Sequence, residues 1–306
     1  MKRTWEDGRR SRGEDGGGGN TAAGKVALAA LVETTIMRCL LPPEILDLIV
    51  DYLHNDPTTL KVCCVVDKSW IPRTRRHLFA RVEFRYFESV STSHVELWKK
   101  TFPDPSNSPA HHTLSLTFRG IPAITAADTD VGGWLRTFHG VVHLCLECHG
   151  WEADPASLVP FYGLSSTVRS LHLTCAFIEV FDLVCSFPLL EDLSLVAFGP
   201  TFDTDGWNAP STSPKLTGSL DLRMITGIRP ATRRLLDLPG GLHFAKITVL
   251  CPDGNLKFIT DLLSRCSDTL ESLTVFNHVR GASHSASVID QHLTVRERRH
   301  IQGVFA

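Results

Sequence analysis

The six residues VRSLHL at positions 168–173 carry the pattern that decides the fold of this chain. Leu171 and Leu173 alternate with His172, which is the period of two expected of a strand with one buried face. The same apolar-x-apolar core recurs along the chain. The pairs are Leu114 and Leu116, Leu144 and Leu146, Leu171 and Leu173, Leu193 and Leu195, Leu220 and Leu222, Ile247 and Val249, and Leu273 and Val275. Five of these cores have a further apolar residue three positions earlier, namely Val141, Val168, Leu190, Phe244 and Leu270.

The spacing of these cores indicates a repeat. Successive first positions lie 30, 27, 22, 27, 27 and 26 residues apart, about 26 on average, and leucine-rich repeats have a period of roughly 20–29 residues. One unit cannot bury its strand face alone, so neighbouring units must stack. The amphipathic segments between the cores, such as 156–162, 177–185 and 255–266, are expected to form convex helices. A βα fold without repeats is the alternative.

Residues 41–79, LPPEILDLIVDYLHNDPTTLKVCCVVDKSWIPRTRRHLF, form a different kind of segment before the repeats. Pro43, Pro57 and Pro72 each stand where a short helix is expected to begin. In the first helix the polar residues form one narrow stripe, so the helix is apolar around most of its circumference. These polar residues are Glu44, Asp47, Asp51 and His54. Either the helix is covered inside its own domain, or one face is kept for a partner.

The motif residues of this segment resemble an F-box. They are Leu41-Pro42-x-Glu44, then Ile49 and Leu53, and finally Val65-Val66-x-x-x-Trp70. The resemblance implies that the segment docks on the Skp-type adaptor of a cullin-based ubiquitin ligase. It assigns Leu41, Pro42, Ile45, Ile49, Leu53 and Trp70 to the adaptor-facing set or to the F-box core, without separating the two. Asp67 departs from the pattern, because the family usually has cysteine or another small residue there. An ordinary three-helix subdomain is the alternative.

The repeats, in turn, resemble the irregular leucine-rich arrays that follow F-boxes, in fungal F-box-like proteins in particular. The expected fold is therefore α/β, with a three-helix F-box followed by a solenoid of short parallel strands and convex helices. We expect a disordered tail over 1–24, a leading helix and the F-box over 25–79, and the solenoid over 80–306. The open end of the array is either truncated or covered by Val288–Phe305.

Together the two resemblances imply a substrate receptor of an SCF-type ubiquitin ligase, with an adaptor and cullin scaffold at one end and a protein target at the other. The target is expected on the concave strand face, at the variable position of each core. These positions are Ser115, Cys145, His172, Ser194, Asp221, Thr248 and Thr274. The alternative function is a leucine-rich interaction scaffold unconnected to ubiquitination.

Composition restricts the remaining possibilities. A net charge of −2 and a pI of about 6.7 argue against a general nucleic-acid binder. The nine cysteines are scattered among apolar residues, as small hydrophobic side chains are in a reducing compartment. No signal-peptide layout or membrane-spanning run is evident. The sequence thus predicts a cytoplasmic or nuclear protein without a membrane partner.

One motif points to chemistry. Cys145, Cys148 and His149 form a C-x-x-C-H pattern, which is typical of haem attachment. In a strand, however, Cys145 and Cys148 would point to opposite faces. Cys175 and Cys185 make no second pair at zinc spacing. We therefore expect no catalytic residues, metal or cofactor, and keep an enzyme that uses Cys145, Cys148 and His149 as the third hypothesis.

Overall fold

The computed structural model describes residues 42–85, 94–120, 131–148, 155–174, 180–197, 211, 213–224, 228–251, 257–277 and 289–294. The chain divides into two units, Met1–Leu46 and Asp47–Ala306. The predicted tail, the predicted leading helix and Leu41 lie outside the described residues. In the part of the chain that is described, no helix is long and apolar enough to cross a bilayer.

Short helices occupy most of residues 43–78. They are α2 (Pro43–Tyr52), α3 (Pro57–Val66), the 3-10 helix η1 (Lys68–Trp70) and α4 (Ile71–Leu78). The carboxylate of Asp56 accepts hydrogen bonds from the backbone N–H groups of Thr58 and Thr59, which caps α3. The prolines at the starts of α3 and α4 lack the N–H that a first turn leaves unbonded.

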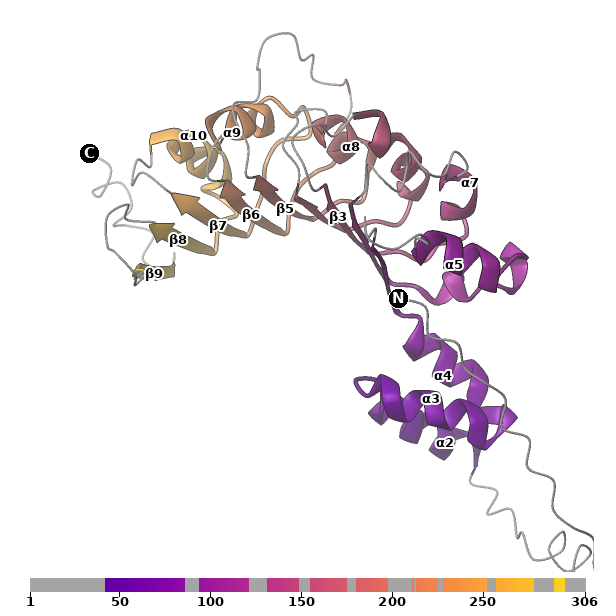
Figure 1. Cartoon of the computed structure of the whole chain (residues 1–306). Helices are drawn as coiled ribbons and strands as arrows, with labels where there is room; N and C mark the ends of the chain where they lie inside the picture. The colour runs from indigo at the N-terminus through magenta and orange to yellow at the C-terminus, as the bar shows by residue number, and fades with distance from the viewer. Residues whose placement is uncertain are drawn as a thin grey trace, which may run out of the picture. The chain divides into compact units, whose positions relative to one another are not determined.

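The rest of the described chain is built on one sheet (Figure 1). Its strands follow sequence order, and each strand from β1 to β7 pairs in parallel with the next. They are β1 (Arg81–Arg85), β2 (Ser115–Arg119), β3 (His143–Glu147), β4 (Ser170–Thr174), β5 (Asp192–Ala197), β6 (Ser219–Met224), β7 (Lys246–Cys251) and β8 (Ser272–Asn277). The prediction of an α/β array of short parallel strands is confirmed.

A ninth strand, β9 (Ile289–Thr294), pairs antiparallel with β8. This strand falls within Val288–Phe305, the segment that we considered as a cover for the open end of the array. Its backbone pairs with the outer edge of β8, an edge that would otherwise present free N–H and C=O groups.

Helices connect the parallel strands on one side of the sheet (Figure 1). They are α5 (His94–Thr101), η2 (Pro105–Asn107), η3 (Pro109–His112), α7 (Val131–Leu135), η4 (Pro155–Leu164), α8 (Val180–Ser186), α9 (Ile228–Leu236) and α10 (Lys257–Cys266). The expected helix at 156–162 is a 3-10 helix, with Pro160 inside it. The opposite side of the sheet carries no helix in Figure 1, and we call it the open face.

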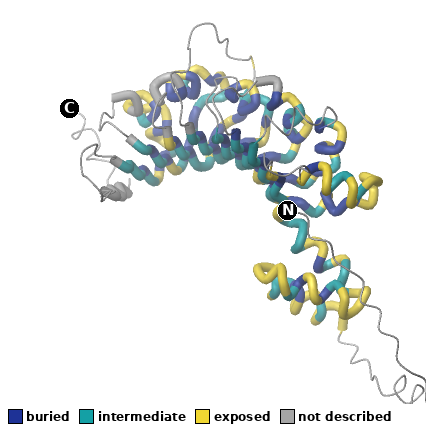
Figure 2. The backbone as a smooth tube through the Cα atoms, viewed as in Figure 1, coloured by how far each residue is buried: buried dark blue, intermediate teal, exposed yellow. Residues whose placement is uncertain are grey.

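Leucines and phenylalanines on the helix side of the strands form the core. In β4, Leu171 and Leu173 are buried, whereas Ser170, His172 and Thr174 are half-buried on the open face. This alternation recurs along the sheet, and Figure 2 shows it as a change between buried and intermediate residues. Apolar residues from the connecting helices, such as Phe181 and Phe187, complete the same cluster.

The repeat begins one unit earlier than predicted, and its first predicted core is displaced by two residues. Leu114 is half exposed, and the pair that lies in register with Leu144 and Leu146 is Leu116 and Phe118. A shift of two residues keeps every side chain on the same face, so periodicity alone does not reveal it. β1 adds Val82 and Phe84 to the same rows.

Backbone hydrogen bonds repeat with the same period. The carbonyl oxygen of Ala80 accepts from the N–H groups of Leu114 and Ser115, at the start of β2. In the same way, the carbonyl oxygen of Leu114 accepts from two N–H groups at the start of β3, and that of Val142 accepts from two at the start of β4. Each unit therefore positions its neighbour through main-chain contacts that do not depend on the side chain present.

Candidate functional site

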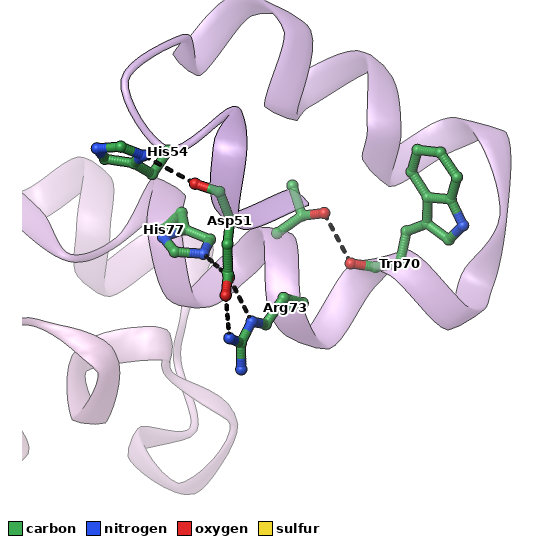
Figure 3. A network of polar contacts seen from close by, with 6 residues as sticks. Asp51, His54, Trp70, Arg73 and His77 are labelled. Atoms are coloured by element: carbon green, nitrogen blue, oxygen red, sulfur yellow. Dashed lines mark hydrogen bonds and ion pairs between the residues drawn. The ribbon is translucent and has the colours of Figure 1, made fainter. Parts of the chain in front are cut away.

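Helix α2 carries a carboxylate on the side that faces α4. Asp51 Oδ1 accepts from Arg73 Nε at 2.6 Å and lies 2.7 Å from His77 Nε2, and a second contact joins its other oxygen to Arg73 (Figure 3). His54 Nδ1 lies 2.8 Å from the backbone oxygen of Asp51. Bidentate pairing with a guanidinium fixes both the distance and the orientation of the carboxylate. The hydrogen bonds to Arg73 and His77 hold the pKa of Asp51 well below its usual range.

The apolar residues of α2 and α3, by contrast, are largely exposed. Seven of the eleven exposed large apolar side chains in the described residues lie on these two helices. We refer to six of them as the apolar set: Leu48, Ile49, Tyr52, Val62, Val65 and Val66. Tyr52 is 87% exposed and Val65 83%. Large apolar side chains that stay exposed mark interaction surfaces in folded proteins when they form a contiguous patch.

The residues that the F-box resemblance assigns to the adaptor-facing set or to the F-box core differ in their solvent exposure. Pro42, Ile45 and Ile49 are exposed, whereas Leu53 and Trp70 are half-buried. Leu41 lies outside the described residues. Leu48, Tyr52 and Val62 were not singled out from the sequence, because a helix that is apolar around most of its circumference does not indicate which side faces solvent.

Asp67, the departure from the F-box pattern, has a structural role here. Its side chain accepts a hydrogen bond of 2.8 Å from the backbone N–H of Ser69 and caps η1. The cap ends α3 directly after Val65 and Val66 and starts the turn toward α4.

On the open face, six of the seven predicted target-binding residues form one continuous row. Each lies in register with the next on the neighbouring strand: Cys145, His172, Ser194, Asp221, Thr248 and Thr274. Ser115 does not belong to this row, because it pairs with His143. Thr117 takes the place that we predicted for Ser115, as a result of the two-residue shift in the first repeat core.

Charged side chains form ion pairs with one another at the β1–β3 end of the open face. Glu83 Oε1 lies 2.7 Å from Arg85 Nε and 2.5 Å from Arg119 Nε. Arg119 Nε also lies 3.6 Å from Glu147 Oε2. The hydrogen bond from Arg85, with Arg119 nearby, lowers the pKa of Glu83. These charges are therefore engaged with each other across three strands.

The cysteine of this row is poorly suited to nucleophilic chemistry. Burial, together with the negative charge of Glu147, raises the pKa of the Cys145 thiol to about 11. The thiolate is the reactive form, and a reactive cysteine needs a lowered pKa. Cys148 is buried on the other face of the strand, as the alternation predicts, and His149 lies outside the described residues.

His172 is held by hydroxyl groups on both sides. Its Nδ1 lies 2.9 Å from Ser194 Oγ and its Nε2 lies 3.3 Å from Thr174 Oγ1. Asp221 contacts Arg223 at 3.0 Å. A nucleophile–histidine–carboxylate chain would need the imidazole between the hydroxyl and the acid, whereas here the serine lies between the histidine and the aspartate in the row. Burial lowers the pKa of His172.

The described residues include no group of three or more His, Cys, Asp or Glu side chains that could hold a metal ion. Two surfaces therefore stand out in the described part, the apolar set and the open face. Comparisons with protein-family models, with curated proteins and with solved structures found no match. The fold defines the class: an α/β array of parallel strands that alternate with helices, preceded by short helices with exposed apolar residues.

Proposed function

We propose that this protein is a substrate receptor of an SCF-type ubiquitin ligase. In this proposal the segment up to residue 79 is an F-box that docks on a Skp-type adaptor and its cullin scaffold. The array from residue 80 onward is a leucine-rich solenoid that binds a target protein. The chain itself would perform no chemistry and would hold the target near the ubiquitin-charged enzyme, which raises its effective concentration there.

The observation that carries the proposal is the exposed apolar set on α2 and α3. Val62, Val65 and Val66 stand on one short helix, and all three are exposed. Covering apolar surface of this kind by a partner is favourable by about 25 cal/mol per Å². A helical partner with an apolar groove fits such a surface, and the adaptor implied by the F-box resemblance is a partner of this kind.

The open face supports the second part of the proposal. Its central row carries small polar side chains such as Ser194, Thr248 and Thr274. A parallel sheet is usually covered on both faces, whereas this sheet carries its helices on one side only (Figure 1). Stacked repeats commonly use such a continuous face for binding.

The test is co-purification of the full chain with a Skp-type adaptor, using a matched pair of valine substitutions. Val66 on α3 is 63% exposed and Val159 on η4 is 60% exposed, so Val66→Lys and Val159→Lys place the same charge at similarly exposed sites. We expect Val66→Lys to abolish adaptor binding, because it would bury an unpaired ammonium group in the interface. Val159→Lys should bind as the wild type does.

The double variant Leu41→Ala/Pro42→Ala examines the motif residues in the same assay, and we expect it to lose binding as well. A wild-type chain that folds but does not bind the adaptor at micromolar concentration would remove the ligase proposal. The alternative would then take its place, a leucine-rich scaffold whose first helices cap the array.

A further inference from the structure

Two arginines and two histidines gather where α4 packs against η3. Arg75 and Arg76 are exposed on α4, and His111 and His112 lie next to them on η3, with ring centroids 3.8 Å apart. In the described part of the chain, none of these four residues forms an ion pair with a carboxylate. Arg73, on the same helix, differs because it is paired with Asp51. We call these four residues the basic corner.

The histidines His112 and His172 differ in the charged groups that act on them. Burial lowers the pKa of both His112 and His172. At His172 the carboxylates of Glu147 and Asp221 act in the opposite direction. At His112 the charged groups that shift the pKa are His111, Arg76 and Arg75, and all three lower it further. An anion placed at this corner would therefore relieve repulsion that the folded chain leaves in place.

A shallow cavity adjoins the corner and shares His111 with it. Its volume is about 440 Å³, and it is lined by Pro105, Ser106, Ser108, His111, Thr137 and His139. His111 Nδ1 lies 3.0 Å from the backbone oxygen of Ser108, which leaves Nε2 for a ligand. The lining offers hydroxyl and imidazole groups and no carboxylate. The carboxylate of Asp104 lies beside the recess and accepts hydrogen bonds from Ser106. The exposed guanidinium groups of Arg75 and Arg76, together with this polar recess, are suited to an extended acidic segment.

We infer that the basic corner is a docking surface for an acidic segment of a protein partner, one rich in aspartate or glutamate. Arg75 and Arg76 are consecutive on a helix, so their side chains diverge by about 100° and do not converge on one phosphate group. Separate carboxylates along a peptide match this divergence, and each guanidinium can pair with one of them in a bidentate way. The inference uses residues outside the apolar set and holds whether or not the adaptor binds.

The first test measures binding of a fluorescein-labelled Glu-Gly repeat peptide to the full chain by fluorescence anisotropy at low salt. The variant Arg75→Glu/Arg76→Glu should weaken binding about tenfold or more. The matched control Arg233→Glu/Arg265→Glu reverses two exposed cations on α9 and α10 and should bind as the wild type does. Equal affinity in the two variants would overturn the inference.

A second test measures the protonation of His112 instead of the affinity for the peptide. Adding the Glu-Gly peptide should raise the pKa of His112, measured from its imidazole NMR resonance, and leave that of His172 unchanged. An unchanged His112 pKa at saturating peptide would contradict docking at this corner. A phosphoserine-Gly peptide that binds when the Glu-Gly peptide does not would also overturn the inference, because it would indicate a phosphate site.

Discussion

At the scale of single residues, Asp51 links α2 to α4. It lies in a helix on which Leu48, Ile49 and Tyr52 face solvent, and it bonds to both Arg73 and His77 (Figure 3). The polar stripe of α2, which sequence analysis would place toward water, therefore includes the residue that holds the helix in place. A partly exposed pair of this kind contributes modestly, and more through its bidentate geometry than through net charge.

We predict that Asp51→Asn lowers the urea midpoint of unfolding near neutral pH, because the amide cannot replace the charged hydrogen bonds to Arg73 and His77. The pKa of Asp51 is lower in the folded state than its ordinary value of 3.8. Its stabilisation is thus complete above that value and is lost as the pH falls below it. The difference between wild type and variant should shrink below about pH 4.

Asp268→Asn is the control for this experiment, since Asp268 lies exposed on the turn after α10. It should leave the midpoint unchanged at either pH. A difference between wild type and Asp51→Asn that persists unchanged at low pH would contradict the ionic role of Asp51.

At the scale of elements, α2 and α3 have their polar and apolar residues distributed in an unusual way. A helix on the surface of a single core normally turns its apolar residues inward. Here Val50, Leu60 and Cys63 are buried, while the apolar set faces solvent. The helices therefore combine a small core of their own with apolar side chains that stay exposed, as the proposed adaptor site requires.

This distribution predicts which substitutions the folded chain tolerates. Tyr52→Lys should change the free energy of unfolding by less than about 0.5 kcal/mol, since the side chain is 87% exposed. Leu60→Ala, at a position 1% exposed, should cost about 2–5 kcal/mol. Chemical denaturation monitored by circular dichroism measures both. A loss on Tyr52→Lys as large as that on Leu60→Ala would mean that the chain itself covers the apolar set.

At the scale of the whole molecule, the described array is quasi-one-dimensional, because each strand pairs only with the strands before and after it. An aromatic cluster strengthens the β1 end, where Phe84 lies 5.1 Å from Phe118 and 5.2 Å from Trp134 between ring centroids. Stability in such arrays is a sum of local terms and nearest-neighbour terms. A destabilising substitution in one repeat unit should therefore affect that unit and its direct neighbours, and leave distant units unchanged.

Hydrogen exchange can test this locality with Leu222→Ala, which removes a fully buried side chain of β6. Amide exchange should become faster in β5, β6 and β7, because they share the altered contacts, and change little in β1 and β2. Peptide-level mass spectrometry provides the measurement. A uniform increase across β1–β8 would show that the array unfolds as one cooperative unit.

The sequence by itself determined the alternation that marks the parallel strands β3 to β8. Alternating residues such as Leu171, His172 and Leu173 specify a half-buried strand, and Asp56-Pro57 specifies a helix start, because both depend on local backbone geometry. Only the tertiary structure decided that Leu116 and Phe118, not Leu114 and Leu116, belong to the first predicted core. It also decided that Asp51 faces α4 while Tyr52 faces solvent. The physical reason is the same in both cases: strand register and the orientation of a helix face depend on partners far along the chain.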